Sequence, residues 1–247
     1  MSSDREHGDA LRTPPVAAEA KSGRELSRLL EHPAIWRGRS VARTKTFSTG
    51  FPALDEGLPG GGWPHAGLIE ILSTCFGTGE LSLLLPVLAA VTRRPEARWC
   101  AWVAPPLQPF APALARCGVA LERVLVVQAH GSGRKSGTKS GAKSGAAKSG
   151  RGEGSSALWA FEQTLRSGTC DIALAWLRSA VPRQIRRLHL AAEKGATLGV
   201  LFRPREAALD SSPAALRVAV EPAALGARVT LLKSRGGARG TIELSLR

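Results

Sequence analysis

The stretch Phe47–Leu88 constrains the fold more than any other part of this 247-residue chain. It contains a short apolar strand at Leu68–Leu72, then a turn with Gly77 and Gly79, then an apolar helix. A strand that leads through a glycine-containing turn into a helix is the setting of a phosphate-binding loop. The lysine that such a loop needs is missing, because Glu80 follows Gly79. The stretch therefore predicts the architecture of a phosphate site without its usual chemistry.

The rest of the chain alternates apolar strands with helices, and the connections are short. Such alternation predicts an α/β domain built around a mostly parallel sheet that helices flank. The further predicted strands are Arg98–Val103, Val124–Gln128, Asp171–Leu177, Leu198–Phe202, Val229–Lys233 and Thr241–Leu246. The further predicted helices are Pro109–Cys117, Ser155–Ser167 and Val181–Lys194. Residues 203–226 show no clear pattern and stay unassigned, whereas the last two strands flank RGGARG and predict a hairpin.

Composition divides the chain into three parts. Residues 1–24 are polar and lack periodicity, which predicts a disordered tail. Residues 25–45 predict a short helix and a linker, and residues 46–247 predict the α/β domain. Within that domain, residues 130–154 carry repeated Lys-Ser-Gly units, which predict a flexible basic insertion.

The net charge of +14 restricts the class of partner. A chain this basic favours nucleic acid or an acidic protein surface, although a coding bias toward Arg and Ala is the alternative explanation. The N-terminal residues do not resemble a signal peptide, and the longest apolar stretch, Leu83–Val91, is too short for a membrane span. We therefore expect a cytoplasmic protein that does not enter the membrane.

Three segments together resemble the core of RecA-type ATPases, over about residues 46–246. In chain order they read STGFPALDEGLPGGGWPHAGLIEI, then CAWV with ALARCGVALERVLVVQ, then ALWAFEQTLRSGTCDIALAWLRSA. Within that superfamily, HPAIWRG, LPGGGWP and GELSLLLPVL most resemble the ImuA family, RecA-like accessory proteins of bacterial mutagenic lesion bypass. The SulA cell-division inhibitors are more distant relatives in the same group.

The resemblance implies a RecA-like fold and a role in SOS-induced, mutagenic translesion DNA synthesis. Its implied partners are single-stranded DNA bound without sequence preference, an ImuB-like Y-family polymerase homologue, an error-prone replicative-type polymerase, and RecA. The implied location is the cytoplasm, in association with the nucleoid.

Departures from the RecA pattern fall on the residues that carry the chemistry. Where the family reads GxxxxGK[ST], Thr74 stands at the first glycine, Glu80 at the lysine and Leu81 at the hydroxyl. The altered phosphate loop comprises Thr74, Gly77, Thr78, Gly79, Glu80 and Ser82. In addition, Trp176 falls near the position of the metal-binding aspartate, and Pro106 near that of the catalytic glutamate. We therefore assign no catalytic or metal-binding residue. We expect ATP and Mg²⁺ as ligands only under the alternative that the chain is an ATPase.

We interpret Glu80 as a substitute for the phosphate. A carboxylate in the first turn of a helix is stabilised by about 0.3–1 kcal/mol, because it faces the positive end of the helix dipole. Glu80 would then keep the loop folded without a ligand.

The resemblance also implies two sets of binding residues. Lys233 and Arg235 match a segment that contacts a neighbouring subunit's nucleotide in RecA-like oligomers, and a solvent-exposed hairpin is the alternative. The DNA-contact candidates are Arg178, Arg183, Arg186, Arg187, Arg203 and Arg205. On the predicted helix Val181–Lys194 three of them share one side at i, i+3 and i+4 spacing, which is also typical of a solvated helix face.

The sequence is compatible with three functions. The first is an accessory factor of lesion bypass that binds DNA and polymerase-side partners. The second is a DNA-stimulated ATPase with a non-standard nucleotide site. The third is a SulA-like inhibitor that caps a cytoskeletal GTPase and needs no DNA.

Overall fold

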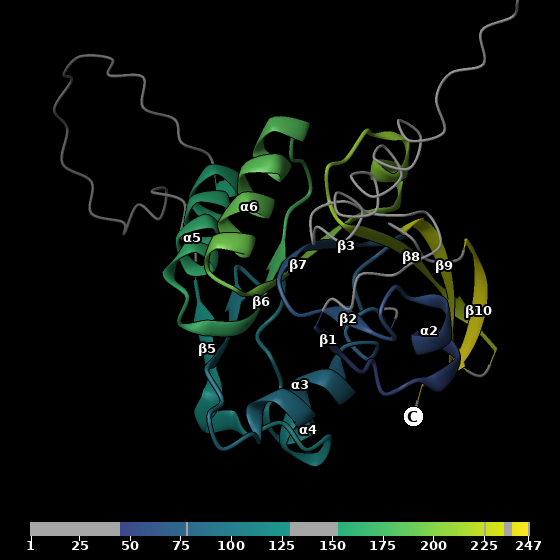
Figure 1. The fold of residues 1–247 in the computed structure, drawn as a ribbon, viewed down its shortest axis with the longest axis horizontal. Helices are drawn as coiled ribbons and strands as arrows, with labels where there is room; N and C mark the ends of the chain where they lie inside the picture. Colours follow the sequence, from purple (N-terminus) through teal and green to yellow (C-terminus); the bar gives the residue numbers. More distant parts are fainter. Residues whose placement is uncertain (1–44, 78, 129–152, 225, 235–238, 247) are drawn as a thin grey trace, which may run out of the picture. The chain divides into compact units, whose positions relative to one another are not determined.

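A computed structural model describes residues 45–77, 79–128, 153–224, 226–234 and 239–246, all within the unit Arg43–Arg247 (Figure 1). The predicted tail and N-terminal helix, and residues 130–152 of the insertion, lie outside the described residues. So do two of the predicted site residues, Thr78 and Arg235.

Within the described ranges, eight strands form one sheet in the order β10-β9-β8-β3-β7-β6-β4-β5. The strands from β8 to β5 are parallel, and β9 and β10 are added antiparallel at one edge. Their bounds are β3 Gly67–Ser73, β4 Trp99–Val103, β5 Val124–Val127, β6 Cys170–Trp176, β7 Leu198–Pro204, β8 Leu216–Ala223, β9 Gly226–Ser234 and β10 Gly240–Ser245. A separate two-stranded sheet pairs β1, Thr46–Phe47, with β2, Trp63–Pro64.

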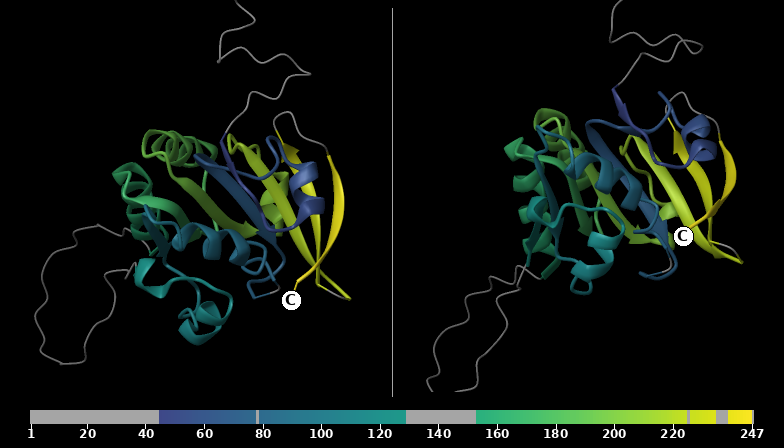
Figure 2. Two further views of the ribbon diagram at one scale, coloured as in Figure 1. Left: turned by 60° about the horizontal axis from the view of Figure 1, so that its bottom comes forward. Right: turned by 90° about the horizontal axis from the view of Figure 1, so that it is seen from below.

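Helices cover both faces of the large sheet (Figure 2). One face, called the α3 face below, packs against α2 (Pro52–Gly57), α3 (Leu85–Thr92) and α4 (Ala111–Arg116). The other, called the α6 face, packs against α5 (Glu153–Ser167), α6 (Pro182–Lys194) and the 3-10 helix η2 (Arg205–Leu209). A second 3-10 helix, η1 (Leu121–Arg123), precedes β5.

The sequence explains where α6 begins and which side it buries. Pro182 stands at its start, and the Val181 N–H donates to Gln184 Oε1 over 3.0 Å. Apolar residues at helical spacing, Ile185, Leu188, Ala191 and Ala192, are buried against the sheet. The other side of the helix carries arginines and faces solvent.

Arg98 fixes the C-terminal ends of α5 and α6 at the amino end of the sheet. Its guanidinium donates to the carbonyl oxygens of Gly168 at 2.8 Å and Gly195 at 3.2 Å, which follow the ends of the two helices. Its Nε pairs with Asp171 at 3.0 Å, and Arg94 pairs with the same carboxylate at 2.8 Å. Burial raises the pKa of Asp171, but the hydrogen bonds from Arg98 and Arg94 outweigh it and hold that pKa below its usual range.

The two edges of the sheet differ in character. At β5, the side chains of Leu125 and Val126 are exposed. At β10, the exposed residues are polar and include Thr241 and Glu243, which pair across the strands with Thr230 and Arg228. The apolar edge is therefore the one beside α4 and η1.

The predicted α/β fold with a mostly parallel sheet between helices is confirmed. One strand of the large sheet was missed, because β8 lies in the unassigned residues 203–226, and the two short strands β1 and β2 were not predicted. The sequence of β8, LRVAVEPA, carries Arg217, Glu221 and Pro222, which hide the apolar pattern of a buried strand. No helix in the described ranges has the length and apolar character needed to cross a bilayer.

Candidate functional site

The loop after β3 occupies the place where open α/β sheets bind ligands. β3 lies between β7 and β8, and the chain leaves it for α3 on one face while α6 leads into β7 on the other. Gly77 and Gly79 both have positive φ, 91° and 103°, so the turn depends on glycine at these positions. Thr74 is exposed and Ser82 is half-buried.

Glu80 turns back into this loop. Its carboxylate Oε1 accepts a hydrogen bond of 2.6 Å from the Gly77 N–H, and the residue is buried. A backbone N–H of this loop is the kind of donor that a phosphate would use. Glu80 thus supplies an internal anion at this donor, as the interpretation of Glu80 as a phosphate substitute requires.

The neighbouring strand ends offer no partner for a nucleotide. Trp176 ends β6, and its ring stacks on Phe202 with the ring centroids 4.7 Å apart and lies 5.8 Å from that of Trp102. Pro106 is exposed in the loop after β4. A buried carboxylate beside the loop would repel phosphate, so these residues do not fit ATP with Mg²⁺. Among the described residues, no group of three or more His, Cys, Asp and Glu is placed to hold a metal ion.

Lys233 belongs to β9 and contacts its own chain. Its Nζ donates to the Ser212 carbonyl oxygen over 2.6 Å, so the side chain fastens the segment before β8. The second member of the predicted pair, Arg235, lies outside the described residues.

The structure separates the predicted DNA-contact arginines into two groups. Arg203 is only 2% exposed and pairs with Glu70 and Asp210, so its prediction as a DNA contact is wrong. Arg205 is half-buried and pairs with Glu221 at 3.2 Å. The exposed group comprises Arg178 in the loop after β6 and, on α6, Arg183, Arg186 and Arg187.

Arg203 is part of a buried ionic cluster that the sequence did not reveal. Glu70, on β3, is completely buried and pairs with Arg203 of β7 at 3.0 Å and with Arg217 of β8 at 2.6 Å. The Arg217 guanidinium also donates to backbone carbonyl oxygens of η2 and the residue after it, among them Asp210 O at 2.9 Å. The cluster holds η2 on the sheet.

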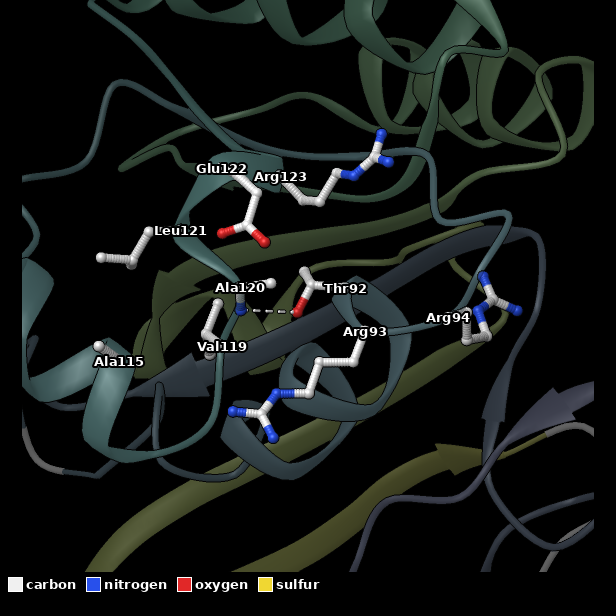
Figure 3. A pocket seen from close by; sticks show the side chains of 9 residues that line it. All are labelled: Thr92, Arg93, Arg94, Ala115, Val119, Ala120, Leu121, Glu122 and Arg123. Carbon is white, nitrogen blue, oxygen red and sulfur yellow. Dashed lines mark hydrogen bonds between the residues drawn. The ribbon is translucent and has the colours of Figure 1, made fainter.

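A groove on the α3 face forms a second candidate site (Figure 3). It has a volume of about 570 Å³ and lies between the C-terminal end of α3 and the segment from α4 through η1. Thr92 sets its floor, because its hydroxyl accepts from the Ala120 N–H at 3.1 Å and donates to the Leu88 carbonyl at 2.7 Å. Figure 3 shows Arg93 and Arg123 on opposite sides of the Thr92–Ala120 hydrogen bond.

Large apolar side chains are exposed in the loop just before α4 as well as in the groove. Leu107 is 80% exposed and Phe110 is 70% exposed, and Leu121 lines the groove. The apolar edge of β5 follows directly. Exposed apolar side chains gathered next to cations mark a protein-binding surface. The sequence analysis missed it, although prolines on both sides of Leu107 signal a segment that leaves the core.

Fold and site together define an α/β protein with a glycine-containing turn that Glu80 closes and a candidate protein-binding surface. The chain is similar to the cell division inhibitor SulA of Edwardsiella piscicida, with 29% identity over 149 residues, 60% of this chain and 75% of that protein. It is 27% identical over 135 residues to the cell division inhibitor SulA of Photorhabdus laumondii, which covers 55% of this chain and 63% of that protein.

A solved structure of SulA from Pseudomonas aeruginosa is also similar, at 26% identity and a TM-score of 0.39, with 55% of this chain and 97% of that one covered. No protein-family profile matches the chain.

These comparisons confirm the predicted relation to SulA and correct the predicted role. DNA repair, translesion synthesis, DNA binding and ATP binding are wrong as predictions, because the matched proteins are inhibitors of cell division. The comparisons support the relation to SulA, whereas the closer resemblance to the ImuA family is not confirmed.

Proposed function

We propose that the chain inhibits cell division by binding FtsZ, the cytoskeletal GTPase of division. The observation that carries this proposal is the similarity to two SulA inhibitors over 60% and 55% of the chain. Such an inhibitor acts by occupying a surface of its target, so it needs no catalytic residue of its own. It would meet its target in the cytoplasm.

The groove beside α4 is the docking surface that we propose for the GTPase. Its lining combines the cations Arg93 and Arg123 with the apolar Leu121, and Glu122 also lies there. Arginine is enriched at protein interfaces. Thr92 keeps the two walls in register, so the surface is formed before the partner arrives.

We further propose that the fold derives from a RecA-like domain in which the phosphate loop became a structural turn. The strand–loop–helix order at β3 and the place of β3 within the parallel sheet support this proposal. The contact between Glu80 and the Gly77 N–H supports it as well, because the loop is closed by its own side chain.

The test measures polymerisation of purified FtsZ by sedimentation, and cell length after expression in growing bacteria. We expect the wild-type chain to lower the sedimented fraction and to produce filamentous cells. Arg93→Glu combined with Leu121→Ser, both exposed residues that line the groove, should abolish both effects without unfolding the chain.

Leu209→Ser is the matched control, because Leu209 is 93% exposed on η2 of the α6 face. This variant should inhibit like the wild type. Unchanged polymerisation and normal cell length with the wild-type chain would refute the proposed function. Full inhibition by the Arg93/Leu121 variant would refute the docking surface alone.

A further inference from the structure

The outward side of α5 and α6 exposes two large apolar residues among cations. We call this the α5–α6 surface, and it comprises Trp159, Arg166, Arg183, Arg186, Arg187, Leu190 and Lys194. Trp159 is 58% exposed and Leu190 is 52% exposed. Tryptophan is highly buried on average, so an exposed indole on a regular helix requires an explanation beyond chain folding.

An ion pair places these residues beside one another. Arg187 of α6 pairs with the buried Glu162 of α5 at 2.5 Å. This contact shows which turn of α5 lies beside which turn of α6. Trp159 precedes Glu162 by three residues and Arg183 precedes Arg187 by four, so each lies one turn earlier on the same side of its helix. Leu190 follows Arg187 by three residues. The two apolar side chains therefore lie on either side of the Glu162–Arg187 pair.

The charge of this surface has one sign. Among the described side chains of α5 and α6, the acidic ones are Glu162 and Glu193. Glu162 is engaged with Arg187, and Glu193 lies 3.3 Å from His189. Arg166, Arg183, Arg186 and Lys194 are all exposed and face solvent. A binding partner would meet two apolar side chains, one on each side of the Glu162–Arg187 pair, with exposed cations around them.

We propose that the α5–α6 surface binds an acidic, amphipathic segment of a partner protein. Carboxylates of the segment would pair with Arg183 and Arg186, and its apolar side chains would pack on Trp159 and Leu190. Arginine and tryptophan are the residue types that dominate binding energy at protein interfaces. A protein fits better than a nucleic acid, because single-stranded nucleic acid is bound in a groove with successive aromatic platforms, and this surface offers one indole on two helices.

This inference does not rest on the proposed function. The α5–α6 surface and the groove beside α4 lie on opposite faces of the sheet, so a ligand could occupy one while the other is free (Figure 2). Variants of the α5–α6 surface should leave inhibition of FtsZ polymerisation unchanged.

The test is fluorescence anisotropy with a labelled synthetic helix that carries Leu at helical spacing and Glu elsewhere. We expect binding that weakens with salt and that falls about tenfold or more for Trp159→Ala and for Arg183→Glu combined with Arg186→Glu. The matched controls are Trp99→Ala, also an exposed tryptophan, and Arg116→Glu combined with Arg239→Glu, which changes the net charge equally. Circular dichroism checks that each variant is folded.

The controls should bind the probe like the wild type. Equal weakening by the controls would show attraction by net charge alone and would overturn the proposal. Tighter binding of a single-stranded oligonucleotide that competes with the probe, and that the same variants abolish, would also overturn it in favour of nucleic acid.

Discussion

On the α3 face, the sheet meets its helices through apolar side chains, whereas on the α6 face arginines bind backbone carbonyl groups. The α3 face contains large apolar residues such as Trp102, Leu88 and Val87. The α6 face has an apolar core under α5 and α6, and three arginines around it. Arg98 binds carbonyl groups at the helix ends, Arg203 binds that of Ala180, and Arg217 binds those of η2.

This difference follows from what covers the sheet. A helix satisfies its own carbonyl groups except at its last turn, so apolar contact is enough to hold it. The short η2 and the helix ends expose carbonyl groups to the interior, and a buried carbonyl needs a donor. Guanidinium groups supply several donors at once, and Glu70 and Asp171 balance their charge.

Glu70→Ala should produce the largest effect, because it leaves two buried guanidinium groups without their central carboxylate. Removal of one partner from a buried ion pair costs about 3–5 kcal/mol. The free energy of unfolding in urea measures this loss. Glu221→Ala is the control, because its pair with Arg205 is more exposed and should contribute less than about 1 kcal/mol. Similar losses for the two variants would contradict the buried cluster.

Leu88→Ala tests the α3 face. The side chain is fully buried, so the cavity should cost about 2–5 kcal/mol in the free energy of unfolding. Because the contacts are apolar, we expect the same loss in mildly acidic and in neutral solution. A loss that changes strongly with pH would show that charges also hold this face. Ala90→Gly, on the exposed side of α3, serves as the control and should cost about 1 kcal/mol or less.

A triple variant, Glu70→Leu with Arg203→Met and Arg217→Met, tests how the arginines of the α6 face stabilise it. It distinguishes charge balance within the cluster from hydrogen bonds to backbone carbonyl groups. In other proteins, apolar replacement of a buried charge triad is neutral or stabilising. Here we expect a loss of about 1–3 kcal/mol, because backbone carbonyl groups of η2 lose their donors. Urea unfolding gives the size, and hydrogen exchange should show faster opening near η2. A more stable triple variant would mean that the cluster serves charge balance alone.

Asp171→Asn should give the smallest effect, about 1 kcal/mol at neutral pH. The pKa of Asp171 is lowered in the folded chain, so its contribution is present above its unfolded pKa of about 4 and is lost as pH falls through the folded pKa. The variant should therefore lose less stability than the wild type in that acidic window. If the unfolding free energies of the wild type and of Asp171→Asn changed with pH in parallel, the result would contradict the role of this carboxylate.

The sequence allowed the fold to be predicted because apolar strands of a parallel sheet stand out from the turns between them. It did not reveal the ionic cluster, since Glu70 and Arg203 are 133 residues apart and each looks solvent-exposed in its local context. Arg203 was assigned to DNA contact because the RecA resemblance places the DNA-binding loops after this strand. β8 was missed because Arg217, which a surface strand would direct to solvent, is turned inward toward Glu70.

The candidate site was predictable only in part. Glu80 was recognised as an obstacle to phosphate chemistry, because the motif fixes which residue type each position needs. The groove beside α4 was not recognised, because an exposed residue such as Leu121 cannot be told from a core residue by type alone. An apolar residue indicates a binding partner only if it is exposed, and exposure is known only from the structure.

The unequal edges of the sheet have a practical consequence for handling the purified chain. A free strand edge can pair with a strand of another molecule, and exposed apolar side chains on that edge favour aggregation. The β10 edge is protected by polar side chains, whereas β5 presents Leu125 and Val126. We expect the solubility limit in concentrated solution to be set at β5, so a lysine in place of Val126 should raise that limit more than any change at β10.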